Sequence, residues 1–429
     1  MFSQRFWAGS ALLAAFALTG CNSGSGGSTS TGSTTSGSTT STGSATDNGD
    51  KIKIGVVASL NGELKPWGQD SKDGCQIAVD EFNAAGGLNG KQVQFLYEDS
   101  NSKPETGKSA TEKLISDDHC IAIIGETASG ISGAMKTATT DNKIPQVMVG
   151  ATNTDLTKDT DYLFRVCYTD KLQGPVMAKF AYEQLGLRKM AVMTDEKTPY
   201  STGLSKSFMD YFKKLGGAIV DEEKYNSGQT VFGGLLTNVK SKNPDGVFCS
   251  GYFTEVGPIV KQARDGGIGK TVPFMGGDGW DSKEILNSGG DAIVGSFFCN
   301  HYTNTDKSAA VQGFLQKWAK THNGSLPGTT MGALGYDAGG LVLDALKRAK
   351  SASPQDLRDA IENTENYHGV SGDITLKGFH GNPPKRALVV KLTTDKVNSQ
   401  ELVKSYEYFD VFPEERPKGS PASTEPTKK

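Results

Sequence analysis

The sequence predicts an α/β protein with two Rossmann-like lobes, each built around a parallel central sheet. Three observations support this fold class. Short apolar stretches alternate strictly with amphipathic stretches along the chain, which is typical of βαβ units and parallel sheets. A chain of 429 residues is too long for one ordinary hydrophobic core. The alternation also starts again near residue 170, which indicates two similar lobes.

The N-terminus is typical of an exported bacterial lipoprotein. Residues 1–5 carry a positive charge, and the apolar run at residues 6–18 is too short to span a bilayer comfortably. The motif LTGC ends at Cys21 and matches a lipobox, so residues 1–20 are predicted to be a signal peptide. Cys21 would then carry the lipid that anchors the chain to a membrane of the cell envelope. An ordinary signal peptide followed by a chance cysteine is the alternative.

Polar segments are predicted to flank the folded part of the chain. Residues 22–49 are almost wholly Ser, Thr, Gly and Asn, a composition that cannot bury apolar surface. We therefore expect residues 21–50 to form a lipid-anchored flexible linker. Residues 413–429 are polar and contain several prolines, so a disordered tail is expected there.

The first part of the folded region is predicted to alternate strands with helices. The helix that follows the first strand should end at Gly86 and Gly87, because glycine readily leaves helical geometry. Residues 102–105, SKPE, have the form of a capping box and predict the start of the next helix. Apolar runs predict strands at residues 51–60, 91–99, 121–124, 144–149 and 162–168.

The same alternation continues from residue 173 and then gives way to helices. Helices are expected over residues 173–185, 202–215, 230–242 and 255–265, and strands over 189–194, 218–225, 246–250, 272–276 and 293–302. Further helices are expected over 309–321, 330–349 and 354–364, the last with Ser353 as its N-cap. Two strand-like segments, 372–376 and 386–394, close the folded region.

Two small-residue loops follow neighbouring predicted strands and suggest one half of a binding cleft. The loops are residues 127–130 (TASG) and 150–153 (GATN). Open α/β sheets bind ligands outside the carboxyl ends of their strands. Both loops contain hydroxyl side chains, and the first loop enters a helix, whose N-terminus suits an anion such as a carboxylate.

Composition argues against several other classes of protein. Acidic and basic residues nearly cancel, 48 against 45, so we expect no nucleic-acid partner. The five histidines show no metal-ligand spacing and there is no CxxC motif, so neither a metal nor another cofactor is expected. The chain also lacks a GxSxG elbow, a P-loop and a GxGxxG after its first strand. We therefore do not expect an enzyme.

The sequence resembles the type I periplasmic binding proteins, in particular the branched-chain amino-acid-binding (leucine/isoleucine/valine-binding) family of ABC transporters in its lipoprotein form. The resemblance covers most of residues 51–400, and the order and spacing of its motifs are more specific than any single motif. The motifs are IKIGVVASLNGELKPWGQDSKDGCQIAVDEFNAAGGLNG, FRVCYTDKLQGP, VKQARDGGIGKTVPFMGGDG and MGALGYDAGGLVLDALKRA.

This resemblance implies two lobes joined by a three-segment hinge that close over a ligand. The crossings would lie near residues 169–172, 301–304 and 380–390. Lobe 1 would then comprise residues 51–170 and 303–385, and lobe 2 residues 171–302 and 386–412. Cys167 and Cys299 lie close to the crossings, where a disulfide and two small buried thiols are equally compatible with the sequence.

The resemblance also implies a ligand pocket. Ser129 stands where the family uses a hydroxyl for the ligand carboxylate, and Asp278 where it usually has a glutamate that holds the ammonium group. The remaining implied contacts are Gly150, Ala151 and Thr152 in the second loop, Tyr200 and Tyr252 in the second lobe, and Trp67 as an aromatic side wall.

Each of these residues also has an ordinary structural interpretation. Ser129 and Thr152 could serve as caps or turn residues, and Asp278 as a turn residue between two glycines. Trp67 could cover the first helix, and the two weaker candidates, Tyr252 and Tyr336, could each pack within a lobe.

The expected function is that of an extracytoplasmic solute-binding lipoprotein, monomeric and lipid-anchored on the periplasmic or extracellular face of a membrane. It would capture an amino acid, branched-chain or related, and deliver it to an ABC transporter permease. The alternatives are a ligand-sensing receptor domain that signals to a membrane partner, and binding of an amide or other small polar solute. Because Asp278 is shorter than glutamate and Trp67 would narrow the pocket, the class of ligand is predicted but not its identity.

Overall fold

A computed structural model describes residues 51–394 and 399–417 of the chain. The predicted signal peptide, the lipidated Cys21, the linker and most of the predicted tail lie outside the described residues. Residues 413–417, expected to be disordered, are described and contain a 3₁₀ turn at Pro413–Glu415. Within the described part of the chain, no helix is long and apolar enough to cross a membrane.

The first sheet has five strands in the order β2-β1-β3-β4-β5, and every pairing in it is parallel. Its strands are β1 (Ile52–Ala58), β2 (Val93–Asp99), β3 (Ile123–Ile124), β4 (Gln146–Met148) and β5 (Leu163–Arg165). The helices that connect them are α1 (Lys65–Ala84), α2 (Pro104–Ser116) and α3 (Ser129–Asp141), with a 3₁₀ turn at Thr154–Thr157. Successive strands of this sheet are connected through a helix or a turn, as the apolar pattern predicted. Parallel strands require such crossover connections.

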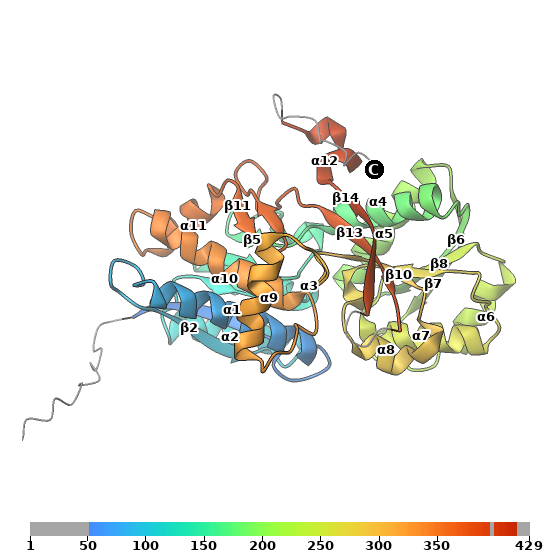
Figure 1. Ribbon diagram of the computed structural model, residues 1–429, viewed down its shortest axis with the longest axis horizontal. Coiled ribbons are helices and arrows are strands. Elements are labelled where there is room, and N and C mark those ends of the chain that lie inside the picture. Colours follow the sequence, from blue (N-terminus) through green and yellow to red (C-terminus); the bar gives the residue numbers. More distant parts are fainter. Residues whose placement is uncertain (1–50, 395–398, 418–429) are drawn as a thin grey trace, which may run out of the picture. The chain divides into compact units, whose positions relative to one another are not determined.

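Helices from the later part of the chain return to this first sheet. They are α9 (Ala309–Thr321), α10 (Met331–Arg348) and α11 (Pro354–Glu362), together with the hairpin β11 (Tyr367–Gly369) and β12 (Gly372–Ile374). Helix α10 lies along α1 (Figure 1). A Cβ atom at Gly74 would stand 2.0 Å from the carbonyl oxygen of Gly332, so glycine is required for this close approach. We call this sheet with its helices the first lobe.

The second sheet has seven strands in the order β14-β13-β10-β9-β8-β6-β7. They are β6 (Lys189–Asp195), β7 (Ala218–Tyr225), β8 (Gly246–Cys249), β9 (Phe274–Gly276), β10 (Phe297–Asn300), β13 (Ala387–Leu392) and β14 (Gln400–Tyr406). The five strands β6 to β10 pair in parallel, whereas β13 and β14 add an antiparallel edge. The sequence pattern missed β14 because this edge strand is mostly exposed and carries no apolar alternation.

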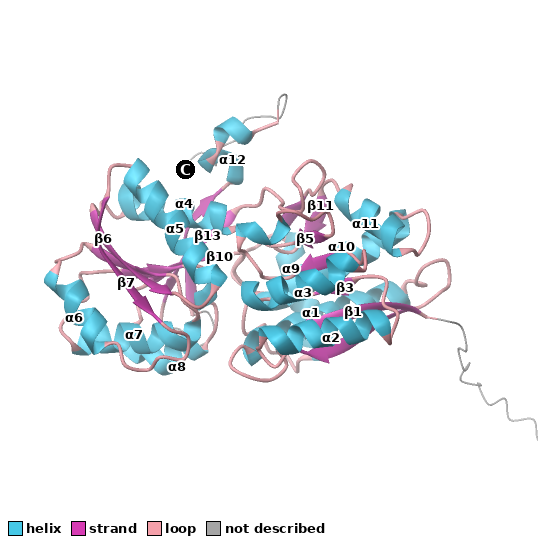
Figure 2. Cartoon of the chain, turned by 180° about the vertical axis from the view of Figure 1, so that it is seen from behind, coloured by secondary structure: helices cyan, strands magenta, loops and turns pink. Residues whose placement is uncertain are grey.

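Helices cover both faces of the second sheet (Figure 2). They are α4 (Asp170–Lys179), α5 (Pro199–Lys214), α6 (Gly233–Ser241), α7 (Phe253–Asp265) and α8 (Glu284–Gly289). Along β6, Met190 and Val192 join the core under α4 and α5, while Ala191 and Met193 join the core with residues of α6 and α7. This alternation is what a strand between two helical layers requires. We call this sheet with its helices the second lobe.

Short elements complete the second part of the chain. A π-helical turn, Phe180–Gln184, continues α4, and 3₁₀ turns occupy Asp278–Trp280 and Gly290–Ala292. A last short helix, α12, spans Tyr408–Val411. The chain passes between the sheets after β5, after β10 and again between β12 and β13. The α/β fold class predicted from the sequence is confirmed, and the residue ranges of the two predicted lobes stay a prediction.

Two predicted helix starts have different outcomes. Ser353 caps α11, since its Oγ accepts a hydrogen bond from Asp356 N at 3.1 Å, as predicted. The predicted capping box at residues 102–105 is wrong. Ser102 has a positive φ of 57°, and its Oγ bonds Leu64 N and the carbonyl of Asn61 instead of capping α2.

The possible disulfide between Cys167 and Cys299 does not form. All five cysteines of the described residues are buried free thiols. Cys167 donates weakly to the carbonyl oxygen of Ala151 at 3.5 Å, whereas Cys299 packs in the core cluster that contains Tyr168. The thiols are therefore small core side chains, the other interpretation that the sequence allowed.

Candidate ligand-binding site

A small cavity lies where the carboxyl ends of strands from both sheets face one another. It is lined by Trp67, Thr127, Ser129, Gly150, Tyr200, Tyr252, Asp278, Gly279 and Met331. The structure thus brings together six of the eight residues predicted to contact a ligand.

Ser129 and Gly150 form part of the first-lobe wall. Ser129 is the first residue of α3, and its Oγ accepts a hydrogen bond from Asn153 N at 3.2 Å. Its own hydroxyl hydrogen can therefore be donated to a ligand. A Cβ atom at Gly150 would stand 2.6 Å from Sδ of Met331, so glycine leaves room for this methionine at the cavity.

Two main-chain N–H groups at the N-terminus of α3 donate hydrogen bonds to a carboxylate of the chain itself, that of Glu126. Glu126 is buried, and its Oε2 accepts hydrogen bonds from Thr127 N at 2.5 Å and Ala128 N at 3.0 Å. Its Oε1 accepts from the hydroxyls of Ser59 at 2.6 Å and Ser100 at 2.9 Å. These two main-chain N–H groups, which we expected to meet a ligand anion, therefore stabilise an internal anion.

Ala151 and Thr152, which were also predicted to contact a ligand, are not among the residues that line the cavity. The side chain of Ala151 belongs to a small apolar cluster beneath the loop, and its carbonyl oxygen accepts from Arg165 Nη1 at 2.7 Å. The hydroxyl of Thr152 accepts from Gln173 Nε2 at 3.3 Å. Both residues therefore build the loop and its connection to α4 rather than the cavity wall.

Three aromatic rings form a continuous wall that spans both lobes. Trp67, from α1, meets Tyr252 edge to face with ring centroids 5.1 Å apart, and Tyr252 stacks on Tyr200 at 5.0 Å. The Tyr200 hydroxyl accepts a hydrogen bond from Gly279 N at 2.8 Å. Such rings offer apolar surface with defined geometry to whatever solute enters the cavity. The weaker candidate Tyr336 lies elsewhere, where its hydroxyl donates to Glu81 at 2.7 Å.

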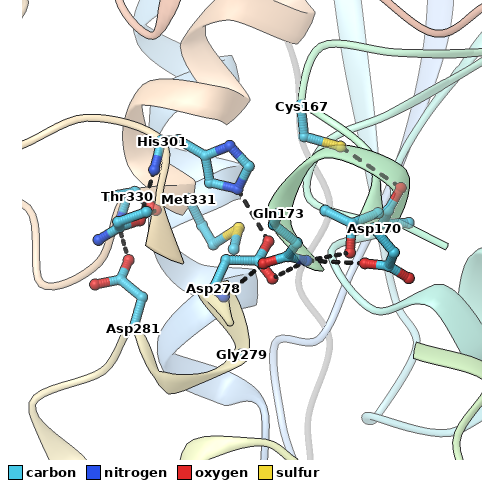
Figure 3. A network of polar contacts seen from close by, with 12 residues as sticks. Cys167, Asp170, Gln173, Asp278, Gly279, Asp281, His301, Thr330 and Met331 are labelled. Carbon is cyan, nitrogen blue, oxygen red and sulfur yellow. Dashed lines mark hydrogen bonds and ion pairs between the residues drawn. The ribbon is translucent and has the colours of Figure 1, made fainter. Parts of the chain in front are cut away.

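Asp278 is held in place by side chains that come from distant parts of the sequence (Figure 3). Gln173 Nε2 donates to its Oδ1 at 3.0 Å, and His301 Nε2 lies 3.0 Å from its Oδ2. The main-chain N–H of Asp278 also donates to Gln173 Oε1 at 3.1 Å. Among the described residues that line the cavity, Asp278 is the only one with a formal charge.

A second carboxylate, Asp170, shares the amide of Gln173. Gln173 Nε2 lies 2.8 Å from Asp170 Oδ1 as well as 3.0 Å from Asp278 Oδ1. Burial, together with the negative charge of Asp278, raises the pKa of Asp170 to about 7. Asp170 therefore takes up a proton more readily than an exposed aspartate does.

Sequence reasoning missed Gln173, His301 and Asp170. Gln173 and Asp170 belong to α4 and His301 follows β10, so neither motif nor spacing linked them to Asp278. Thr127, Gly279 and Met331 were also missed as lining residues, although Thr127 shares a loop with Ser129 and Gly279 follows Asp278. Within residues 51–394 and 399–417, no group of three or more His, Cys, Asp or Glu side chains could hold a metal ion.

Two α/β lobes with a small-molecule cavity at the facing strand ends define a bilobal solute-binding protein. The chain belongs to the periplasmic binding protein family, whose model matches residues 51–396. This finding confirms the resemblance to type I periplasmic binding proteins.

The chain is similar to several branched-chain amino-acid-binding proteins. It is 29% identical over 341 residues to the Leu/Ile/Val-binding protein BraC3 of Rhizobium johnstonii, covering 76% of this chain and 90% of that protein. The crystal structure of a leucine binding protein, LivK, from Thermotoga maritima matches with a TM-score of 0.78 and 31% identity over 84% of this chain and 99% of the other. The substrate binding protein LivJ of Streptococcus pneumoniae, solved in complex with isoleucine, matches with a TM-score of 0.76 and 33% identity over 83% of this chain and 100% of the other.

Proposed function

We propose that this protein captures an amino acid between its two lobes and delivers it to the permease of an ABC transporter. The observation that carries the proposal is the cavity itself, which has one carboxylate, Asp278, the Ser129 hydroxyl and an aromatic wall. The names of its relatives, which include leucine and branched-chain amino-acid-binding proteins, support the same class of ligand.

The chemistry of a free amino acid suits this arrangement. Both charges of the zwitterion lose hydration in a closed cavity, so each needs a hydrogen-bonding or oppositely charged partner. Asp278 would hold the ammonium group, and Ser129 would donate its hydroxyl hydrogen to the carboxylate. Trp67, Tyr200 and Tyr252 would cover the apolar side chain. Because these groups belong to different lobes, ligand binding would favour the closed arrangement.

The location of the protein belongs to the same proposal. Membership of the periplasmic binding protein family supports an extracytoplasmic position. The lipobox that ends at Cys21 and the polar linker after it would hold the binding domain to a membrane while leaving it free to reach a permease. We expect a monomer that acts as a binding protein and not as an enzyme.

A thermal-shift panel tests the proposed ligand class. The panel contains the natural L-amino acids and small amides, each added to the purified chain from residue 22 onward. Saturating branched-chain amino acid should raise the unfolding midpoint of the parent protein, because a ligand that binds only the folded state stabilises it. Absence of a shift with every amino acid would contradict the proposal.

A neutral amide is the second candidate ligand. The observation that favours it is Glu126, which already accepts the hydrogen bonds of Thr127 N and Ala128 N. A ligand carboxylate would thus meet fewer main-chain donors than expected. A neutral amide carries no negative charge and therefore needs fewer such donors. A shift with acetamide or propionamide, and none with amino acids, would identify this alternative.

A further inference from the structure

Asp281, three residues after Asp278, is fully buried and lies at the junction of the two lobes. All three of its oxygens accept hydrogen bonds from other elements. Its carbonyl oxygen accepts from Trp67 Nε1 at 2.7 Å, its Oδ2 from Thr330 N at 2.5 Å, and its Oδ1 from Gln400 Nε2 at 2.6 Å. Figure 3 shows the contact between the Asp281 carboxylate and Thr330.

Two of these donors belong to the first lobe, whereas Asp281 belongs to the second. Trp67 lies in α1, and Thr330 directly precedes α10, the helix that packs along α1. Asp281 follows the 3₁₀ turn Asp278–Trp280, which comes after β9 of the second sheet. The two hydrogen bonds therefore join the lobes directly.

The two contacts to the first lobe involve Trp67, which lines the cavity, and Thr330, which is next to a lining residue. Trp67 is itself part of the aromatic wall, and Met331 immediately follows Thr330. On the other side, the turn that leads into Asp281 carries Asp278 and Gly279, which also line the cavity. Asp281 does not line the cavity, yet it ties together residues from both of its sides.

Neighbouring polar groups strengthen this junction. The hydroxyl of Thr330 donates to Asn300 Oδ1 at 3.1 Å, and Asn300 Nδ2 donates to Gln400 Oε1 at 2.8 Å. Thr329, by contrast, donates its N–H and hydroxyl to Asp70, a carboxylate of the first lobe itself. The start of α10 thus meets one carboxylate from each lobe, and helix N-termini stabilise negative charge.

A buried carboxylate is unfavourable unless its hydrogen-bonding capacity is met. Separating the lobes would remove Thr330 N from the Asp281 carboxylate and Trp67 Nε1 from its carbonyl oxygen. The energy of these bonds is therefore available only in the closed arrangement, which is also the arrangement that encloses the ligand.

We infer that Asp281 is a positioning residue that stabilises the closed arrangement and thereby sets ligand affinity from outside the cavity. This inference rests on the proposed function for the ligand, whereas the interlobe contacts exist without one. It predicts that weakening Asp281 lowers affinity without altering any group that touches the ligand.

Binding measurements on three variants test the inference. Asp281→Asn keeps the shape of the side chain but removes its negative charge. Gln400→Ala removes one hydrogen-bond donor to Asp281 and serves as the second variant if Asp281→Asn folds poorly. Glu255→Gln is the matched control, because Glu255 is also buried and accepts from a main-chain N–H, of Gly228, but within the second lobe. For L-leucine and L-isoleucine we expect Asp281→Asn to weaken binding about tenfold, or about 1.4 kcal/mol. The change should appear in the dissociation rate measured by stopped flow.

Hydrogen exchange without ligand provides a second readout that does not depend on the proposed function. The peptide containing Thr330 should exchange faster in Asp281→Asn than in the parent, and a peptide from α7 should not change. Parental affinity and parental exchange in both Asp281 and Gln400 variants would overturn the inference. If neither amino acid binds the parent, the proposed function fails, and the exchange of the Thr330 peptide alone decides the role of Asp281.

Discussion

Glu126 and Asp278 are both buried carboxylates that follow the carboxyl end of a strand, β3 in the first sheet and β9 in the second. Within the described part of the chain, Glu126 accepts five hydrogen bonds, from the hydroxyls of Ser59, Ser100 and Thr127 and from two main-chain N–H groups. Asp278 is bonded by the side chains of Gln173 and His301, and it faces the cavity.

The difference separates a structural carboxylate from one that can serve a ligand. A carboxylate offers about four lone-pair positions. The bonds to Glu126 fill that capacity with donors of its own lobe, whereas Asp278 keeps capacity on the side of the cavity. Glu126 and Asp278 therefore have similar positions in the fold but different roles. The number of hydrogen-bond donors around each carboxylate determines its role. The following experiments are ordered from the largest expected effect to the smallest.

Replacing Asp278 should have the largest effect on binding. Asp278→Asn removes the only charge among the described lining residues, so a bound ammonium group would lose its partner. We expect amino-acid affinity measured by calorimetry to fall about 100-fold, or about 3 kcal/mol. Asp291→Asn, an exposed change, is the control. Unchanged affinity in Asp278→Asn would contradict the inference that Asp278, unlike Glu126, serves the ligand.

Replacing Glu126 should act on stability instead. In Glu126→Gln the side-chain NH₂ would face hydroxyl and N–H donors, which leaves buried donors unsatisfied. The free energy of unfolding in urea should fall by about 2 kcal/mol. Glu63→Gln, on an exposed side chain, should leave it unchanged. A stable Glu126→Gln protein that no longer binds amino acids would assign Glu126 to the ligand and break the comparison.

The pH dependence of the unfolding free energy tests whether Asp170 is protonated in the folded protein. Burial and the charge of Asp278 raise the pKa of Asp170 from 3.8 to about 7, so the folded protein binds a proton that the unfolded chain releases. The contribution of this group to stability therefore falls as pH rises from about 4 through 7. Between pH 5 and pH 8 the unfolding free energy of the parent should fall by about 3 kcal/mol more than that of Asp170→Asn. Parallel pH profiles would contradict this, and Asp155→Asn, exposed, is the control.

Removing the Tyr200 hydroxyl should have the smallest effect. Tyr200→Phe keeps the stacked ring but leaves Gly279 N without its acceptor, which loosens the turn that carries Asp278. We expect a loss of about 1 kcal/mol in binding free energy by calorimetry. Tyr211→Phe, elsewhere on α5, should bind like the parent. A loss in Tyr200→Phe as large as that in Asp278→Asn would indicate that the hydroxyl contacts the ligand itself.

Local patterns predicted the elements of the fold better than the contacts of the site. The strand and helix alternation was recovered, and β14 was missed because its residues are polar and exposed. Ser129, Trp67, Tyr200 and Asp278 were predicted and do meet at one cavity. Thr152 was assigned to the ligand from the family resemblance and from its loop, yet its hydroxyl accepts a hydrogen bond from Gln173, a pairing that the loop sequence does not encode.

The sequence by itself determined the α/β class, the two-lobe organisation and the loops that contribute residues to the cavity. These follow from apolar periodicity, turn residues and chain length, which are properties of neighbouring residues. Only the tertiary structure decided which buried polar groups satisfy one another. Gln173 reaches Asp278 across 105 residues, and Trp67 reaches Asp281 across 214. Such pairings arise because burial forces polar groups to find partners in space, whatever their distance along the chain.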